Sequence, residues 1–261
     1  MADSDQSLSL GKKIFFFHPS EFIRNQVIAQ LAQKEFEVYI IEEEGKLRKA
    51  LKKYPGSIMF ACISEAMMES AWDELVRNIN REMNENIETA AVNIGIIASM
   101  ENESLRQKYL EQYNVSCGFS VMHSDLEMAV LQLVNILNSV NAKGRRNYIR
   151  LIVDKETKIA VNFPMHGTFI DGIIKDISVV GFSCTFTDDP DLIKNAVFGD
   201  IQFRLQNQLL KAEGNVFGSR MDGAEKVYVI LFTQRVDTGV YTVIRKYIQS
   251  SLQKRIDKEL D

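Results

Sequence analysis

The first half of the chain is organised around a run of six apolar residues, Ile58-Met59-Phe60-Ala61-Cys62-Ile63. The run does not alternate with polar residues, which is typical of a strand that is covered on both faces. Comparable runs lie on either side of it, and a stretch with helical spacing of apolar residues follows each one. These other runs begin at Ile14, Glu37, Val92 and Gly118. Five strand–helix units in series predict a parallel sheet with helices on both faces, over residues 12–140.

The last helix predicted in this half runs from Leu126 to Val140. Ser124 and Glu127 fit a capping box at its start. Apolar residues lie on more than one side of this helix, which predicts packing on its own sheet and also against the second domain or another subunit. The chain then turns small and polar over residues 138–144, a composition typical of a junction between domains.

Beyond this junction the pattern changes to short strands separated by Gly, Asp, Asn and Pro, which predicts a small antiparallel barrel. The expected strands are Tyr148 to Val153, Lys158 to Asn162, Gly167 to Ile177, Gly181 to Phe186, Asp200 to Arg204, Gln208 to Val216 and Val227 to Phe232. A closing helix, with apolar residues from Val240 to Leu252 on one face, is expected to lie across the barrel. The fold class is therefore α/β plus β.

The expected organisation has four parts. They are a disordered or loosely ordered leader (1–11), an α/β domain (12–140), a linker (141–150) and a barrel with a C-terminal helix (151–261).

Composition excludes several classes of protein. Of the 261 residues, 46% are hydrophobic and 25% are charged, which is typical of a globular protein and not of a disordered chain. The net charge of -4 argues against nucleic-acid binding. The first 145 residues carry 15 basic and 20 acidic groups and the rest carry 16 and 15, so an anion site is expected in the second half. The start resembles no signal peptide, and no apolar run approaches the ~18 residues of a membrane span, so we expect a soluble cytoplasmic protein.

Neither a metal site nor a catalytic site is indicated. The three cysteines form no CxxC pair and lie among apolar neighbours, so we expect them in the core. His18, His123 and His166 lack ligand spacing and have no nucleophile at a recognisable distance. The stretch Asp188-Asp189-Pro190-Asp191 has calcium-like oxygens but lacks the rest of an EF-hand loop. We therefore expect no enzyme activity, no metal and no cofactor.

Two short motifs carry the chemistry of the second half. Arg145, Arg146 and Arg150 stand at the junction, with the last two at RxxxR spacing. Residues 176–181, Asp-Ile-Ser-Val-Val-Gly, have the pattern [DN]-x-S-x-x-G between two predicted strands. Taken singly, the arginines could merely solvate a linker and the second motif could merely form a turn. Their pairing, in this order and with strands between them, favours a ligand site.

Over residues 144–235 this arrangement resembles the PilZ domain, a receptor for the bacterial second messenger cyclic di-GMP. That ligand presents two phosphodiester anions and two guanines. Arginine forks match phosphate oxygens and guanine O6 and N7, and guanidinium planes stack on bases. The resemblance implies that Arg145, Arg146 and Arg150 clamp the ligand and that Asp176 accepts hydrogen bonds from guanine. Ser178 would donate to a phosphate or hold the turn, and Gly181 would allow a close approach of backbone and ligand.

Residues 12–140 resemble a response-regulator receiver domain in the order of strands and helices, but without its phosphoryl chemistry. Phe17, His18 and Pro19 stand where an acidic pair would hold Mg²⁺, and Cys62, Ile63 and Ser64 stand where the phosphoacceptor Asp would be. Ser99 matches the hydroxyl residue after the fourth strand, whereas Met122 and His123 replace the lysine. We interpret this half as a degenerate receiver-like domain without a phosphorylation site that docks a protein partner.

The leading hypothesis is a cyclic di-GMP effector in which ligand binding rearranges the domains and alters a partner interaction. The alternative is a protein-interaction adaptor whose PilZ-like barrel does not bind nucleotide. A phosphorylation-driven response regulator is disfavoured by the missing carboxylates. The expected partners are cyclic di-GMP and a protein that binds the N-terminal domain, with no nucleic acid and no membrane span.

Overall fold

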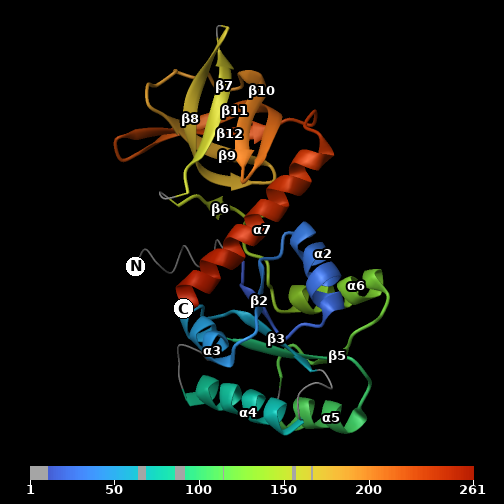
Figure 1. The fold of residues 1–261 in the computed structure, drawn as a ribbon. Helices are drawn as coiled ribbons and strands as arrows, with labels where there is room; N and C mark the ends of the chain where they lie inside the picture. Colours follow the sequence, from blue (N-terminus) through green and yellow to red (C-terminus); the bar gives the residue numbers. More distant parts are fainter. Residues whose placement is uncertain (1–10, 64–68, 86–91, 114, 155–156, 166) are drawn as a thin grey trace. The chain divides into compact units, whose positions relative to one another are not determined.

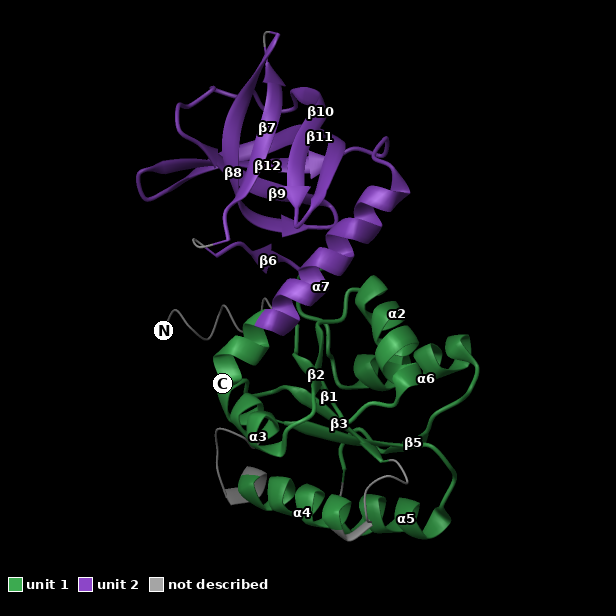
Figure 2. Cartoon of the chain, viewed as in Figure 1, with its two compact units in different colours: residues 1–147, 255–261 green, residues 148–254 purple. Residues whose placement is uncertain are grey.

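The structure is a computed structural model that describes residues 11–63, 69–85, 92–113, 115–154, 157–165 and 167–261. Its contacts divide the chain into two compact units (Figure 2). The first consists of residues 1–147 with 255–261, and the second of residues 148–254. Apart from Gly11, the leader expected over residues 1–11 lies outside the described part of the chain, as do Ser64 and His166.

A five-stranded parallel sheet forms the centre of the first unit, with the strand order β2-β1-β3-β4-β5. Its strands are β1 (Ile14–Phe17), β2 (Val38–Ile41), β3 (Ile58–Ile63), β4 (Asn93–Ala98) and β5 (Phe119–Val121). Every residue of β1 is buried, and so is all of β3 except Ile63. The continuous apolar runs therefore correspond to strands that are covered on both faces, as predicted.

Helices cover both faces of this sheet (Figure 1). They are η1 (Ile23–Val27), α2 (Ile28–Gln33), α3 (Glu44–Lys53), α4 (Glu69–Glu85), α5 (Glu103–Gln107), η2 (Lys108–Gln112) and α6 (Leu126–Ser139). On one face, Leu31 of α2 and Leu133 of α6 share a core cluster with Phe60 of β3. On the other face, the ring of Phe17 meets that of Trp72 in α4, with the centroids 5.8 Å apart. The predicted series of strand–helix units is confirmed.

The start of α6 differs from the predicted capping box. The N-cap is Asp125 rather than Ser124, and its Oδ1 accepts a hydrogen bond from the backbone nitrogen of Met128 at 2.9 Å. Aspartate and serine are equally good caps, so the local pattern did not decide between these neighbours. On the side where further packing was expected, Val134 is partly buried against the core, whereas Leu131 remains 53% exposed.

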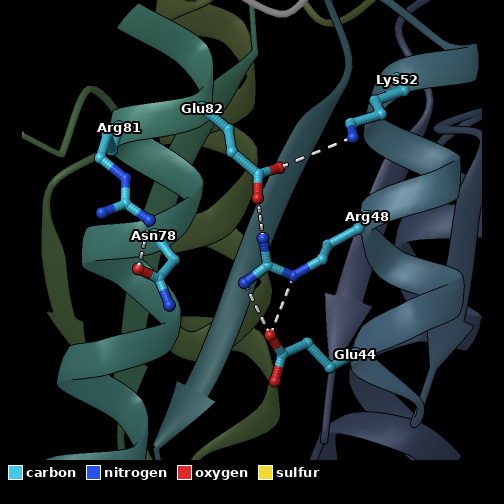
Figure 3. Close-up of polar contacts among 6 residues, drawn as sticks. All are labelled: Glu44, Arg48, Lys52, Asn78, Arg81 and Glu82. Atoms are coloured by element: carbon cyan, nitrogen blue, oxygen red, sulfur yellow. Dashed lines mark hydrogen bonds and ion pairs between the residues drawn. The ribbon is translucent and has the colours of Figure 1, made fainter. Parts of the chain in front are cut away.

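Charged side chains link α3 to α4 (Figure 3). Arg48 donates two hydrogen bonds to Glu44 Oε1, at 2.9 and 2.7 Å, and also pairs with Glu82 on α4. Lys52 Nζ lies 4.0 Å from the other oxygen of Glu82. Partly exposed pairs of this kind stabilise a fold by roughly 0.2–1 kcal/mol each. We interpret the network as a structural link between the two helices.

Residues 255–261 complete the first unit, because α3 and the residue that follows it hold them in place. Lys49 Nζ donates to the backbone oxygen of Leu260 at 2.7 Å, and Lys53 Nζ lies 2.8 Å from Glu259 Oε2. Tyr54 also donates to Glu259; burial and then this hydrogen bond raise the pKa of Tyr54. The expected division grouped 151–261 together, whereas these contacts place the last seven residues with the first unit.

The second unit is an antiparallel barrel. Its strands are β6 (Leu151–Ile152), β7 (Ile159–Met165), β8 (Thr168–Ser178), β9 (Gly181–Phe186), β10 (Val197–Leu205), β11 (Gln208–Asp222) and β12 (Glu225–Phe232). The strand order is β6-β8-β7-β10-β11-β12-β9, and an additional pairing between β8 and β9 closes six of these strands into a ring. All seven predicted strands are present, and the expected fold class is confirmed.

Helix α7 (Thr238–Leu260) follows the barrel. Its residues Ile244, Tyr247 and Ile248 belong to the barrel's core cluster, together with Phe182 and Phe203. The first half of the helix therefore packs on the barrel, as predicted.

The three cysteines are buried in the two cores, as predicted. Burial raises the pKa of the Cys117 thiol to about 11, and burial likewise raises the pKa values of Cys62 and Cys184. Within the described residues, no helix is both long enough and apolar enough to cross a membrane.

Candidate functional site

The second motif forms the turn between β8 and β9. Ser178 ends β8 and Gly181 begins β9, and the two residues pair across the turn. The Ser178 hydroxyl is buried and donates to the backbone oxygen of Gly181 at 3.2 Å. Of the two roles expected for Ser178, the structure contains the one that holds the turn.

Gly181 lies where no side chain fits. Its φ is +156°, and a Cβ at this position would lie 2.1 Å from the backbone oxygen of Ile230 in β12. Heavy atoms without a bond between them do not approach so closely, so only glycine allows β9 to pair with β12 here. The approach expected at Gly181 was one of backbone and ligand, whereas the atoms that require glycine here belong to the backbone of a neighbouring strand.

Asp176 lies on the outer side of β8, next to a β-bulge between Ile174 and Asp176. Its Oδ1 lies 3.3 Å from Nη1 of Arg150, and its Oδ2 accepts a hydrogen bond from the Ser183 hydroxyl. The Asp176 side chain is 14% exposed, while that of Arg150 is 39% exposed. An arginine and an aspartate that are 26 positions apart in the sequence are therefore neighbours.

Ser183 belongs to neither sequence motif. It lies directly opposite Asp176 in the register between β8 and β9 and is 1% exposed. Only the cross-strand register places Ser183 beside Asp176. A β-bulge shifts that register by one residue, and the local sequence does not indicate where the bulge lies.

The remaining two arginines lie just before this site in the chain. Arg145 and Arg146 are both exposed and fall within residues 1–147, the range of the first unit. Arg150 falls within the second unit. Of the six predicted site residues, four fall within the second unit. Arg150 pairs with Asp176 of β8, Ser178 ends β8, and Gly181 begins β9.

The acidic turn after β9 is occupied by a lysine. Lys226 Nζ lies 3.0 Å from Asp189 and 3.2 Å from Asp191, and Tyr228 donates to Asp189. Hydrogen bonds from Tyr228 and then from Lys226 lower the pKa of Asp189 to about 2. These carboxylates therefore have an internal cation as their partner.

A histidine at the carboxyl end of β1 and an arginine of η1 share one glutamate. His18 Nδ1 lies 2.9 Å from Glu42, and Arg24 pairs with the same carboxylate. A buried carboxylate in α4, Asp73, binds Lys108 and accepts from the Tyr109 hydroxyl at 3.1 Å. Each of these carboxylates is thus held by a cation of the same unit.

Comparisons with known proteins give one kind of match. No family model and no curated protein matches the chain. Among solved structures, the PilZ domain of YcgR from Escherichia coli with c-di-GMP is 16% identical, with a TM-score of 0.36, over 44% of this chain and 95% of that one. YcgR of E. coli in complex with c-di-GMP is 14% identical, with a TM-score of 0.39, over 45% and 50%. The MrkH–c-di-GMP complex of K. pneumonia is 17% identical, with a TM-score of 0.40, over 45% and 57%. The match therefore spans about half the length of the two longer proteins.

Proposed function

We propose that this chain is a bacterial cyclic di-GMP effector, with the ligand bound on the outer side of the barrel in the second unit. One observation carries the proposal: the Arg150 guanidinium lies 3.3 Å from the Asp176 carboxylate, so residues from both sequence motifs meet at one place. A single motif is weak support for a ligand site, whereas two motifs that converge in space meet the context that such a site requires.

The chemistry of these side chains suits a cyclic dinucleotide. Arg145, Arg146 and Arg150 offer forks for the two phosphodiesters and for guanine O6 and N7. Asp176 accepts hydrogen bonds from guanine N–H groups. Ser178 and Gly181 hold the turn that follows Asp176 and so orient its carboxylate. Binding would move the Arg150 guanidinium from a carboxylate of the protein to a phosphate oxygen or a guanine acceptor of the ligand. No covalent bond is made or broken, so the proposed role is that of a receptor and not of an enzyme.

Signal output follows from the position of the arginines. Residues 145–150 span the boundary between the two units at 147/148. A ligand that orders this segment selects those arrangements of the units that are compatible with the clamp. The first unit, as a receiver-like docking domain, then presents an altered surface to a protein partner in the cytoplasm.

Calorimetric titration of the full chain with cyclic di-GMP tests the binding. We expect saturable binding that Asp176→Ala weakens, and poor competition by GTP, which lacks the second guanine. The same titration gives the stoichiometry, which is one ligand, or two stacked ligands if the additional cation of Arg145 takes part. Absence of binding by the wild-type chain would exclude the proposal.

The rearrangement has its own test. Small-angle scattering is expected to give a narrower distance distribution at saturation with ligand, and hydrogen exchange at residues 143–150 is expected to slow. If both measurements stayed the same while binding was confirmed, the effector mechanism through this segment would be wrong.

An adaptor without a ligand is the second candidate. Asp176 already pairs with Arg150 and accepts a hydrogen bond from Ser183. These contacts satisfy the carboxylate within the protein, which favours a structural role without a ligand. The same titration separates the two functions, since an adaptor would give no heat with cyclic di-GMP.

A further inference from the structure

Beside Asp176, the outer side of the barrel carries an apolar residue that belongs to neither motif. Ile152 of β6 lies directly opposite Asp176 of β8 in the strand register. Side chains of directly opposed residues stand on the same face, about 4.5–5.5 Å apart at Cβ. Ile152 is 64% exposed, whereas the preceding residue, Leu151, points into the core and is 2% exposed.

Arg150 immediately precedes this short strand, and its guanidinium also lies beside Asp176. Its Nη1 is 3.3 Å from Oδ1 of that carboxylate. On the other side of Asp176, the register continues through Ser183 of β9 to Val229 of β12, which is half-buried. An arginine, an aspartate and a serine thus lie together, with an apolar side chain on either flank.

A purine base has a polar edge and two apolar faces, and this row offers a partner for each. The Asp176 carboxylate suits the N–H groups of a guanine edge, while an exposed isoleucine next to it covers part of a face. Single exposed apolar residues are common on protein surfaces and need no partner. The distinguishing feature of Ile152 is its position, opposite Asp176 and two residues after Arg150.

We propose that Ile152 is a positioning residue for the ligand, against which one guanine face packs while the edge of that base bonds to Asp176. This inference rests on the proposed function, because it assigns the residue to the same cyclic di-GMP site. It adds an exposed apolar contact to the charged and hydrogen-bonding groups of the site. That contact makes affinity depend on the base as well as on the phosphates.

The test compares Ile152→Ser with a matched control in the full chain. Leu209 of β11 is 52% exposed and lies directly opposite Arg204, so it too is an exposed apolar residue beside a charged one. In calorimetric titrations with cyclic di-GMP, we expect Ile152→Ser to weaken binding about fivefold, from the loss of apolar area that the base would cover. Ile152→Leu should stay within about twofold of wild type, since it retains that apolar area, and Leu209→Ser should leave affinity unchanged. Thermal melts confirm that each variant is folded.

Two further readouts separate an apolar contact from an indirect effect on the arginine. The loss caused by Ile152→Ser should be the same at low and high salt, whereas the loss caused by Arg150→Ala should shrink at high salt, because salt screens charges. Ile152→Ser should also make the heat-capacity change of binding less negative, which is the marker of apolar burial.

Each result decides the inference. Three outcomes would overturn the role of Ile152 and leave the proposed function in place. They are wild-type affinity in a folded Ile152→Ser variant, an equal loss of affinity in Leu209→Ser, and a loss of affinity in Ile152→Ser that shrinks with salt like that of Arg150→Ala. Failure of the wild-type chain to bind cyclic di-GMP would overturn both.

Discussion

The two units use their sheets in opposite ways. In the first unit, β1 and β3 are buried on both faces, so that sheet can present side chains to a ligand only at the ends of its strands. In the second unit, β11 alternates buried and exposed residues over much of its length, as a barrel with a solvated outer side requires. A barrel strand can therefore offer side chains such as Asp176 along its length.

The two units also differ in where their ion pairs lie. Helix-surface charges of the first unit, such as Arg48 and Glu82, pair with each other and align helices. Arg150 and Asp176 also pair, but at a place where two sequence motifs meet on a sheet. An ion pair indicates a functional site when its members come from separate sequence motifs.

The largest effect is expected from Gly181→Ala. Its Cβ would collide with the backbone oxygen of Ile230, so we expect the free energy of unfolding of the barrel to fall by about 3 kcal/mol or more. Gly218→Ala on β11 is the control, because no atom lies within 4 Å of the added Cβ, and it should stay within about 0.5 kcal/mol of wild type. Urea unfolding followed by far-UV circular dichroism measures both variants.

The same experiment tests whether the two units are independent. Trp72 is the only tryptophan of the chain and reports on the first unit. A loss confined to the barrel leaves the Trp72 fluorescence transition of Gly181→Ala in place. If that transition moved together with the circular dichroism signal, the two units would unfold as one, and the contrast between them would not extend to stability.

The next effect concerns the arginines. Arg146→Ala and Arg150→Ala should each remove a charge-assisted fork and weaken cyclic di-GMP binding by ~1.5–3 kcal/mol, or about ten- to a hundredfold. Arg204→Ala, an exposed arginine on β10, is the control for loss of one positive charge and should bind like wild type. Equal affinities for all three variants would contradict the clamp.

A smaller effect is expected at the acidic turn, and it depends on pH. The pKa of Asp189 is lowered to about 2, so its contribution to stability is complete above the ordinary aspartate pKa of about 3.9 and is lost as the pH falls through about 2. Asp189→Asn should therefore melt below wild type at pH ~7, with a difference that shrinks below pH ~4. The exposed neighbour gives the control variant, Asp188→Asn, and a similar pH-dependent difference there would argue against a specific role for Asp189.

We expect no effect when a phosphoryl analogue is added to the protein. The strand β1 ends at Phe17 and is followed by His18, which offer no carboxylate to Mg²⁺, so beryllofluoride with Mg²⁺ should leave the first unit unaltered. Trp72 lies beside Phe17 at the end of β1, so its fluorescence is a sensitive probe of that place. A spectral change with beryllofluoride and Mg²⁺ together, but not with Mg²⁺ alone, would show that this unit binds a phosphoryl analogue.

Much of the fold could be predicted from local patterns. Apolar runs such as Ile58 to Ile63 specify buried strands, and the change of period after residue 144 separates the α/β part from the barrel. Where two neighbouring residues suit the same role equally well, as Ser124 and Asp125 do at the start of α6, the pattern could not choose between them. The contacts that bring residues 255–261 into the first unit are also invisible in the pattern, because their partners lie some 200 positions earlier in the chain.

Local sequence patterns are enough to identify the two fold classes and the seven strands of the second unit. They also identify the arginines, Asp176, Ser178 and Gly181 as candidate site residues. Tertiary structure alone decided that Arg150 pairs with Asp176, that Ser183 and Ile152 flank that carboxylate, and that Gly181 makes room for Ile230. The physical reason is that hydrophobic periodicity is a local property, whereas cross-strand neighbours depend on register. A single bulge in β8 shifts that register, and only the closed barrel specifies where it lies.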